Sequence, residues 1–386
     1  MFITHVLGGP PVALGIVEGA ADATSSALKV VSGRWSDRLG ARKPIVVLGY
    51  TLSSLVRPFI AVTTSWAHVF AIRVTDRVGK GLRSSPRDAM LASLAPPGER
   101  GRVFGYHWAM DHAGAAIGPL LATIFLYFSP DNYRLLFGLT IIPGALAVIT
   151  LTRVPETSAP AKVSAFAPEG RSGETSPELA GHRASAGGPK VPGVPEVPRV
   201  ELPVQLRKYL WIYSIFTLGN SSDAFLLLQL SHAGVPLIGL TMLWSGQHAI
   251  KALITMKGGM LSDRLGRRTL IISGWLIYAV VYAGFAFSES VYALITWFLI
   301  YSAYAAAVEG SEKALVADLT PERVRATAFG WHAAVQGFGA LAASVFFGLV
   351  WQYFGAPAAF FAGASLALIA ALLLGLSHDI HGRGDH

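Results

Sequence analysis

A short basic motif occurs twice in this chain, half a chain apart. Gly33–Pro44 reads G-R-W-S-D-R-L-G-A-R-K-P, and Gly259–Leu270 reads G-M-L-S-D-R-L-G-R-R-T-L. Each copy lies between two apolar segments. A single repeat of this length indicates two homologous halves, and not a solenoid of many small units.

The composition favours a membrane protein. Of 386 residues, 52% are hydrophobic and only 14% are charged, whereas a soluble domain carries about 25% charged residues. A net charge of +8 would suit nucleic acid, but the basic residues cluster in short loops between apolar runs, so we expect no nucleic-acid partner. The sequence has no cysteine, which excludes disulfides and thiolate sites, and no cleavable signal is visible at its start.

The repeated motif resembles the loop between the second and third helices of major facilitator superfamily transporters, whose pattern is roughly G-x-L-x-D-R-x-G-R-R/K. The resemblance implies an all-α membrane protein built from two six-helix repeats. It also implies secondary transport of a small molecule by rocking of the two halves about a site between them. Such a protein is not an enzyme and needs no cofactor, and we expect a monomer.

Eleven apolar segments of this chain approach the length needed to cross a bilayer, which is about 20 residues. Numbered by the slots of a twelve-helix transporter, they fill slots two to twelve: 12–32, 45–62, 66–84, 103–128, 133–151, 209–230, 236–257, 269–287, 291–307, 327–353 and 357–376. Slot one is missing, because one segment precedes the motif in the first half and two precede it in the second. Either the start codon is assigned too late or the chain is a true eleven-helix variant. The pairing of bundles in the resembling fold favours the late start.

These segments divide the chain into four parts. Residues 1–152 are the N-terminal helical bundle, and residues 209–377 are the C-terminal one. Residues 153–208 between them are rich in Pro, Gly, Ser, Ala and Glu and lack hydrophobic periodicity, which predicts a flexible linker. Residues 378–386 form a short tail.

The lysines and arginines of the short loops fall almost entirely on one side of the predicted membrane. The opposite loops hold only Arg134. This asymmetry predicts that the basic side, with the linker and the C-terminus, is cytoplasmic. We therefore expect a multi-pass protein of the cell (inner) membrane, with the lipid bilayer as its solvent.

The aspartates of the repeated motif are the predicted gate. The resemblance implies that Asp37 and Asp263 pair with an arginine or a helix N-terminus of a neighbouring helix and hold one conformation closed. The alternative is a pair of solvated loops whose charges only set the topology. The predicted gating motif comprises Gly33, Asp37, Arg38, Gly40, Gly259, Asp263, Arg264 and Gly266.

Ionisable residues within membrane helices are functional candidates, because a charge is costly in lipid. Glu18 and Asp22 share a face of slot two, and each disfavours ionisation of the other. His107 and Asp111 share a face of slot five, where a buried polar contact between helices is the alternative. Arg73 belongs to a stretch that resembles the family's fourth-helix motif, whose arginine is implicated in proton coupling. These five residues are the predicted proton-coupling candidates.

Other polar residues of the helices are predicted to face the substrate. The predicted cavity residues are Lys29, Asp76, Asn220, Asp223, Gln247, His248, Lys251 and Tyr304. For Lys29 the alternative is snorkelling toward the cytoplasm. For Glu309 and Glu312 two roles are open. Either they contact the substrate, or they pair with Lys313 or with arginines of the loops. For Arg57 in slot three, the sequence predicts a buried side chain in an ion pair.

Two further patterns are rejected as sites. Gly79-Lys80-Gly81 lacks both the earlier glycine and the following Ser or Thr of a phosphate-binding loop. An ion gradient is therefore favoured over ATP as the energy source. The histidines of the tail have no scaffold to order them, so no metal site is predicted.

The sequence predicts a secondary transporter that moves a small molecule by alternating access. Gly114-x-x-x-Gly118-Pro119 partly matches the fifth-helix motif of exporters in the same superfamily. This match and the intramembrane charges favour proton-coupled export by an antiporter. One rival is an uptake permease for an organic solute. The other is a transport-inactive membrane sensor or partner protein, which a truly absent first helix would favour.

Overall fold

The computed structural model describes residues 11–96, 98–156 and 201–380, with side chains from Thr24 onward. The part of the chain so described is almost entirely helical. The N-terminal helices are α1 (Pro11–Leu39), α2 (Lys43–Val56), η2 (Arg57–Val62), α3 (Trp66–Leu94), α4 (Arg100–Phe128), α5 (Tyr133–Leu139) and α6 (Ile141–Thr152). The later helices are α7 (Val204–Gly219), α8 (Ala224–His232), α9 (Leu237–Leu265), α10 (Arg267–Phe287), α11 (Val291–Asp318), η3 (Glu322–Val324), α12 (Arg325–Phe354) and α13 (Ala356–Leu376).

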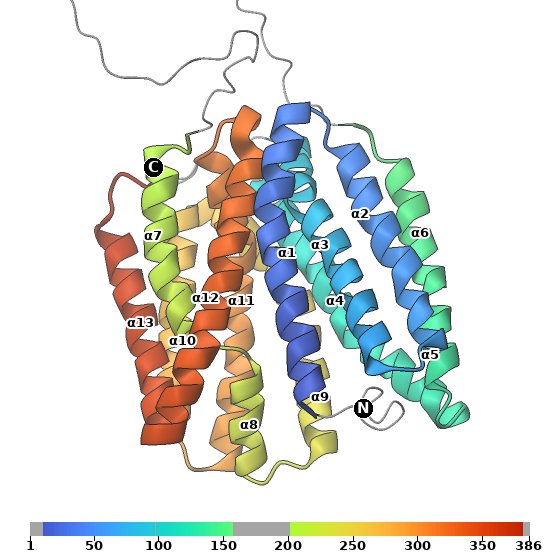
Figure 1. The fold of residues 1–386 in the computed structure, drawn as a ribbon. Coiled ribbons are helices and arrows are strands. Elements are labelled where there is room, and N and C mark those ends of the chain that lie inside the picture. Colours follow the sequence, from blue (N-terminus) through green and yellow to red (C-terminus); the bar gives the residue numbers. More distant parts are fainter. Residues whose placement is uncertain (1–10, 97, 157–200, 381–386) are drawn as a thin grey trace, which may run out of the picture.

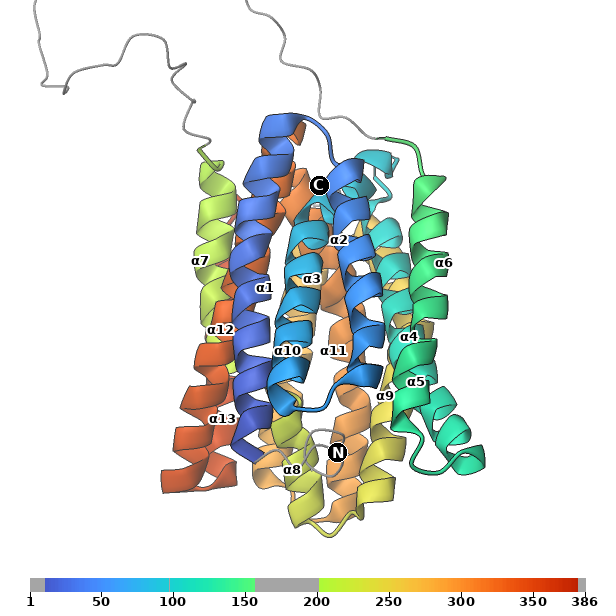
Figure 2. The ribbon, with the colours of Figure 1, turned by 45° about the vertical axis from the view of Figure 1, so that its right-hand side comes forward.

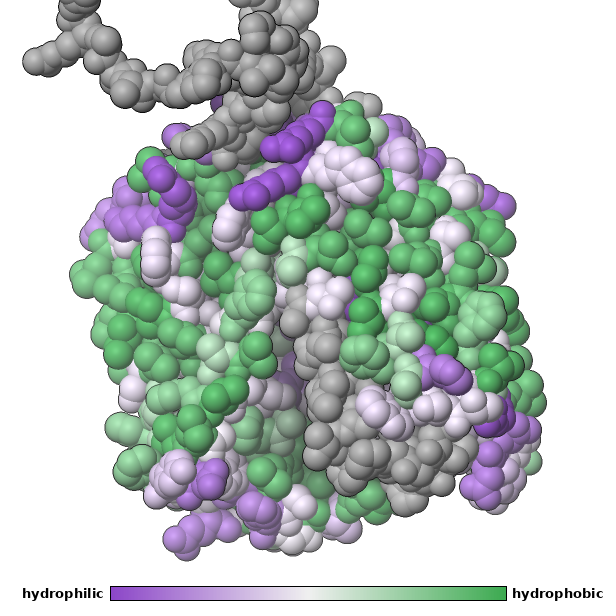
Figure 3. All heavy atoms as spheres, viewed as in Figure 1, coloured by the Kyte–Doolittle hydropathy of each residue, from purple (hydrophilic) through white to green (hydrophobic). Residues whose placement is uncertain are grey.

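Helices occupy every apolar segment predicted from slot two to slot twelve. Among the described residues, 7 helical stretches are long and apolar enough to cross a membrane. Apolar side chains cover the middle of the face seen in Figure 3, and hydrophilic ones gather toward its two ends. This arrangement is stable in a lipid bilayer, because helices satisfy their own backbone hydrogen bonds and present apolar side chains to the lipid.

The helices form two groups that lie side by side (Figures 1 and 2). One group holds α1 to α6 and the other holds α7 to α13. The groups meet mainly where α4 packs along α9 and where α1 packs along α12. The end of the bundle at the top of Figure 1, where α1 ends and α12 begins, is called the basic end below.

The helix of slot seven is broken. The sequence predicts one helix over 209–230, whereas α7 begins at Val204 and ends at Gly219, and α8 begins at Ala224. Pro203 precedes α7 with an extended backbone, a conformation from which a helix readily starts. The break at residues 220–223 leaves backbone groups that need partners, which membrane helices tolerate only inside protein or beside a cavity.

Most of the predicted loop motif is helical. α1 continues to Leu39 and α9 to Leu265, so the turns shrink to a few residues around Gly40 and Gly266. Both glycines have positive φ, 67° and 95°, which ends the helices with little strain because glycine has no Cβ. Hydropathy locates the apolar part of a helix, and it misses a polar last turn that points out of the lipid.

The buried core lies mostly in the second half. Rings of that half stack closely, with 4.6 Å between the centroids of Tyr213 and His332 and also between those of Phe216 and Trp275. In the first half, α5 and α6 have no buried residue among those described. The second half therefore packs tightly around aromatic rings, while the described residues of α5 and α6 are exposed or half-buried.

Several predictions fall outside the described residues. Residues 157–200, most of the predicted linker, and residues 381–386 of the tail are among them. So are residues 1–10 and the side chains of Glu18 and Asp22. The linker, the missing first helix and the slot-two carboxylates stay predictions.

Candidate functional site

A cavity of about 550 Å³ lies between the two halves. Its walls come from α1, α3 and α4 on one side and from α7, residues 220–223, α9, α11 and α12 on the other. Figure 3 shows the surface hollowed along the line between the halves. The charged residues that line the cavity are Lys29, Lys80, Asp223, Lys251, Glu309, Glu312 and Lys313. A polar space of this size between two bundles suits a small molecule.

Five of the predicted cavity residues line this space: Lys29, Asn220, Asp223, Lys251 and Tyr304. The helix break at residues 220–223 places Asn220 and Asp223 beside it. The Asn220 amide donates to the Tyr304 hydroxyl at 3.3 Å. The Asp223 carboxylate accepts from Tyr301 at 2.9 Å and lies 3.9 Å from the Lys251 ammonium.

The other three predicted cavity residues lie elsewhere. Asp76 is buried and binds Arg57, with 2.8 Å between Oδ1 and Nε. This is the ion pair expected for Arg57, although the Arg57 side chain is 49% exposed rather than buried. Gln247 is buried in α9. His248 belongs to a chain of polar groups that crosses between the halves.

This polar chain runs from α4 to α9 and α11. The Nδ1 atoms of His112 and His248 are 3.0 Å apart, and His112 Nε2 lies 2.7 Å from Glu309 Oε2. Because each close contact requires a proton between its two atoms, the chain holds protons at the interface of the halves. The Trp108 ring stacks beside His112 and the Trp244 ring meets His248 edge-on.

Of the predicted coupling residues whose side chains the structure describes, none lines the cavity. His107 and Asp111 lie 3.8 Å apart on α4, and the Asp111 side chain is 53% exposed. His107 instead lines a second cavity of about 590 Å³ beside Arg102 and Met256. Arg73 is half-buried in α3. Their role in proton coupling stays a prediction.

Asp37 caps a helix of the opposite half. Its carboxylate accepts hydrogen bonds from the backbone N–H groups of Ala326 at 3.2 Å and Thr327 at 2.6 Å. These residues begin α12, where N–H groups lack partners within the helix and the helix dipole favours an anion. Gly33 allows the close approach, since a Cβ there would overlap the Ala326 carbonyl.

Asp263 makes the equivalent contact from the other half. It accepts from the N–H groups of Gly101 at 2.9 Å and Arg102 at 2.8 Å, at the start of α4. Gly259 approaches the Gly101 carbonyl so closely that a Cβ would overlap it. Each motif copy thus binds the N-terminus of a helix across the interface. Arg38 and Arg264 of the same motifs are exposed.

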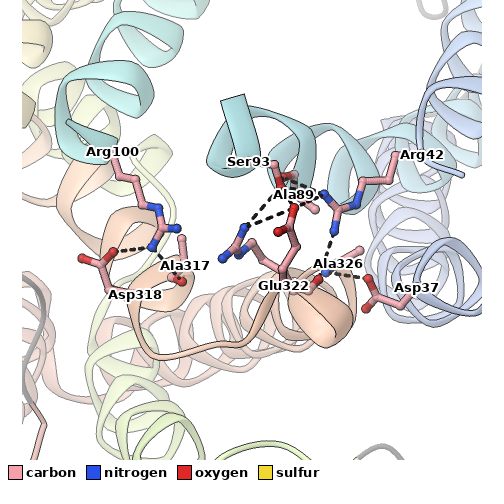
Figure 4. Close-up of polar contacts among 10 residues, drawn as sticks. Asp37, Arg42, Ala89, Ser93, Arg100, Ala317, Asp318, Glu322 and Ala326 are labelled. Carbon is pink, nitrogen blue, oxygen red and sulfur yellow. Dashed lines mark hydrogen bonds and ion pairs between the residues drawn. The ribbon is translucent and has the colours of Figure 1, made fainter. Parts of the chain in front are cut away.

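Figure 4 shows arginines and acids that join the two halves beside the Asp37 contact. Arg42 Nη1 donates to Ser93 at 2.7 Å and Nη2 donates to the Glu322 carbonyl at 3.0 Å. Ser93 donates to Glu322 Oε1 at 2.7 Å and accepts from Arg325 at 3.2 Å. We call Asp37, Arg42, Ser93, Glu322 and Arg325 the first latch. Burial lowers the pKa of the Arg42 guanidinium, while the carboxylates of Asp37 and Glu322 oppose that effect.

The second latch consists of Asp263, Arg267, Arg100 and Asp318. Arg100 Nη1 donates to Asp318 Oδ1 at 2.6 Å, as Figure 4 shows. Arg267 Nε donates to Asp318 Oδ2 at 3.2 Å. Arg267 also binds Asp263 on its own half. Together the latches join the halves at the basic end.

Sequence reasoning did not predict the arginines and acids that complete the latches. A signal was present, because Arg100 and Arg325 are separated by 225 residues, as are Gly105 and Gly330 of the recognised slot-five and slot-eleven repeat. An arginine that starts the same helix in both halves marks a position that the repeat has kept.

A helical membrane bundle of two halves, with a polar cavity between them and ion pairs across one end, is the architecture of a transport protein. The family model described as Major Facilitator Superfamily matches residues 1–256 and 213–382. An uncharacterized MFS-type transporter of Methanocaldococcus jannaschii is 30% identical over 383 residues, which cover 97% of this chain and 88% of the relative.

Two further similarities are to named transporters. The multidrug resistance protein MdtH of Photorhabdus laumondii is 33% identical over 122 residues, or 32% of this chain and 30% of MdtH. The crystal structure of the human organic anion transporter MFSD10 matches with a TM-score of 0.72 at 19% identity, over 97% of this chain and 88% of that one.

The chain belongs to the Major Facilitator Superfamily. It is a membrane transporter and not an enzyme, and the predicted all-α fold of this family is confirmed.

Proposed function

We propose that this transporter exports a small molecule in exchange for protons, by exposing the central cavity alternately to the two sides of the membrane. The observation that carries the proposal is the cavity of about 550 Å³, lined by both halves and by seven charged residues. The two latches, which join the halves at one end only, support a rocking motion about this cavity. The cavity and both latches form within one chain, which supports a monomer.

We place the basic end in the cytoplasm of a cell with the protein in its inner membrane. The support is the concentration of Lys and Arg at the loops of this end. On this assignment, residues 153–208 and the C-terminus are also cytoplasmic. The conformation described above then has its cytoplasmic end closed by the latches.

Partial similarity to a multidrug resistance protein supports export over uptake. The similarity covers only 32% of this chain. It therefore does not support assigning a substrate of that protein to this transporter. The organic anion transporter that shares the fold makes anions a second substrate class to test. A polar cavity that both halves line favours a working transporter over a transport-inactive sensor.

Protons are the proposed coupling ions. The ionisable groups that support this are the predicted set, Glu18, Asp22, Arg73, His107 and Asp111. The chain of His112, His248 and Glu309 adds groups that lie at the interface itself. A carboxylate or imidazole that faces alternate sides can take a proton on one side and release it on the other.

The decisive experiment uses the purified protein in proteoliposomes with a pH dye trapped inside and an imposed pH gradient. We expect either ethidium, an organic cation, or fluorescein, an organic anion, to move with the gradient and to dissipate it. We also expect at least one of Glu18→Gln, Asp22→Asn, Asp111→Asn and Glu309→Gln to abolish gradient-driven movement while sparing exchange. Substrate movement that ignores the pH gradient in the parent protein would overturn proton coupling. A full response in all four variants would assign coupling to other residues.

A further inference from the structure

Two charged residues one turn apart on α11 each bind the opposite half. Glu309 Oε2 lies 2.7 Å from His112 Nε2 on α4. Lys313 Nζ lies 2.7 Å from Asp88 Oδ2 on α3. Neither contact belongs to a latch, and both Glu309 and Lys313 line the cavity. These contacts therefore connect the cavity wall to the interface of the halves.

The Lys313 side chain is largely buried although it borders the cavity. It is 12% exposed, and the Asp88 side chain is 9% exposed. The Trp108 ring centroid is 4.9 Å from Nζ and that of Phe104 is 5.9 Å away, both from α4. A cation placed over aromatic faces and beside a carboxylate is well stabilised, but only while the halves stay together.

Asp88 and Lys313 occupy corresponding positions of the internal repeat. They are separated by 225 residues, the same spacing that separates Gly105 from Gly330. Residues that are equivalent by the repeat and touch each other lie at the pseudo-two-fold axis between the halves. Like charges would repel there, and the two halves have instead diverged to opposite charges. The contact is thus specific to the assembled interface.

We propose that Glu309 and Lys313 exchange partners when the basic end opens, pairing with each other along α11 in place of His112 and Asp88. This inference rests on the alternating-access function proposed above. In the closed state each residue pairs across the interface, and in the open state the two residues form an ion pair one turn apart. The two residues thereby set the balance between the two states.

The spacing and order of the two residues suit the exchange. Glu309 precedes Lys313 by four positions on the helix, which is the favourable orientation for an intrahelical ion pair. When the halves part, Asp88 keeps Arg87, whose Nη2 lies 3.1 Å from its Oδ1. His112 carries no obligatory charge, because an imidazole is stable in its neutral form. Glu309, Lys313 and Asp88 therefore each keep a hydrogen-bonding or charged partner in both states, which keeps the two states close in free energy.

The chain contains no cysteine, so a single introduced cysteine can report opening of the basic end. Thr327 is 2% exposed and its N–H group binds Asp37 across the interface. Thr327→Cys, nearly equal in size, provides the reporter in full-length protein reconstituted into nanodiscs, where both faces are accessible. The measurement is the rate of reaction with a membrane-impermeant maleimide.

Partner exchange predicts opposite effects for two neutralising changes. Asp88→Asn weakens the Arg87 contact in both states but the Lys313 contact in the closed state alone. Labelling should therefore accelerate by about tenfold, since a buried ion pair of the closed state has lost one partner. Glu309→Gln can still accept from His112 but can no longer pair with Lys313, so labelling should slow by about threefold. The double variant should lie between them. If both single changes accelerate labelling, the two contacts are simple clamps and the exchange is wrong.

Two further variants keep the test decisive. Asp88→Ser replaces Asp88→Asn if the latter does not fold, with the same expected acceleration. The swap Asp88→Lys with Lys313→Asp restores the closed pair but places an acid beside Glu309, so labelling should fall below the parent rate. Acceleration in the swap would contradict the proposal.

The control is Glu99→Gln, which removes the exposed pair with Arg102 at the same end but within one half. It should leave the rate unchanged, and a change would show that the reporter responds to surface charge alone. A parent protein that never labels, although its denatured form does, would instead contradict alternating access itself.

Discussion

The first and second latches bind corresponding helix starts but neutralise their arginines differently. In both, an aspartate at the end of a helix accepts two backbone N–H bonds from the other half. At position 93 the first latch has a serine, and at the corresponding position 318 the second has an aspartate. In the first latch the carboxylate that lies beside the arginines belongs to Glu322, whose side chain is 37% exposed, whereas the Asp318 side chain of the second latch is 3% exposed.

The two latches therefore share the geometry of their backbone contact but differ in the free energy that their side chains contribute. The repeat preserves the backbone contact, because the start of a helix offers the same unpaired N–H groups in both halves. The side chains around that contact have diverged. The buried carboxylate between two arginines of the second latch is expensive to disturb, whereas the half-exposed Glu322 can exchange its arginines for water.

The largest effect is expected at the buried acid of the second latch. Asp318→Asn leaves Arg100 and Arg267 without their shared carboxylate, which should cost about 3 kcal/mol of stability. The corresponding change in the first latch, Ser93→Ala, removes neutral hydrogen-bonding capacity and should cost about 1 kcal/mol. Thermal unfolding of the two purified variants side by side gives the comparison. Equal losses would mean that the latches are energetically alike despite their different residues.

An intermediate effect is expected at the helix-capping aspartates. Asp37→Asn weakens two charge-assisted hydrogen bonds to the start of α12 and should cost about 2 kcal/mol. Asp263→Asn should cost more, because Asp263 also binds Arg267. Both variants should insert normally and transport more slowly, since a weaker closed end shifts the balance of conformations. Parental transport rates in both would reduce the motif to a topology signal.

The smallest effect is expected at Glu322. Glu322→Gln removes a partly exposed carboxylate that lies 3.6 Å from Arg42, and it should cost about 0.5 kcal/mol. The hydrogen bond that Ser93 donates to position 322 can still form, because the amide oxygen of the variant side chain can accept it. The difference in Tm from the parent should shrink further at high salt, because exposed charges are screened. A loss as large as that of Asp318→Asn would show that the first latch also depends on a buried charge.

Local patterns determined much of this protein. Each apolar segment predicted for slots two to twelve coincides with helix in the structure, because a bilayer requires long apolar helices wherever they pack. The repeat of S-D-R-L-G predicted two homologous halves and identified Asp37 and Asp263 as candidate gate residues. The polar residues 220–223 were visible as candidates for the cavity, although the break in the helix there was not.

Only the tertiary structure decided which charges meet. Asp76 was grouped with the cavity by its place on the helix, yet it binds Arg57. Asp88 and Lys313 touch across 225 residues of sequence. Such contacts depend on how two bundles dock, and hydropathy or helical spacing carries no information about a partner on another bundle. The same holds for the backbone N–H groups of Ala326 and Gly101, in the first turns of α12 and α4. Each binds a carboxylate of the opposite half, and only the docking of the halves brings that carboxylate within reach.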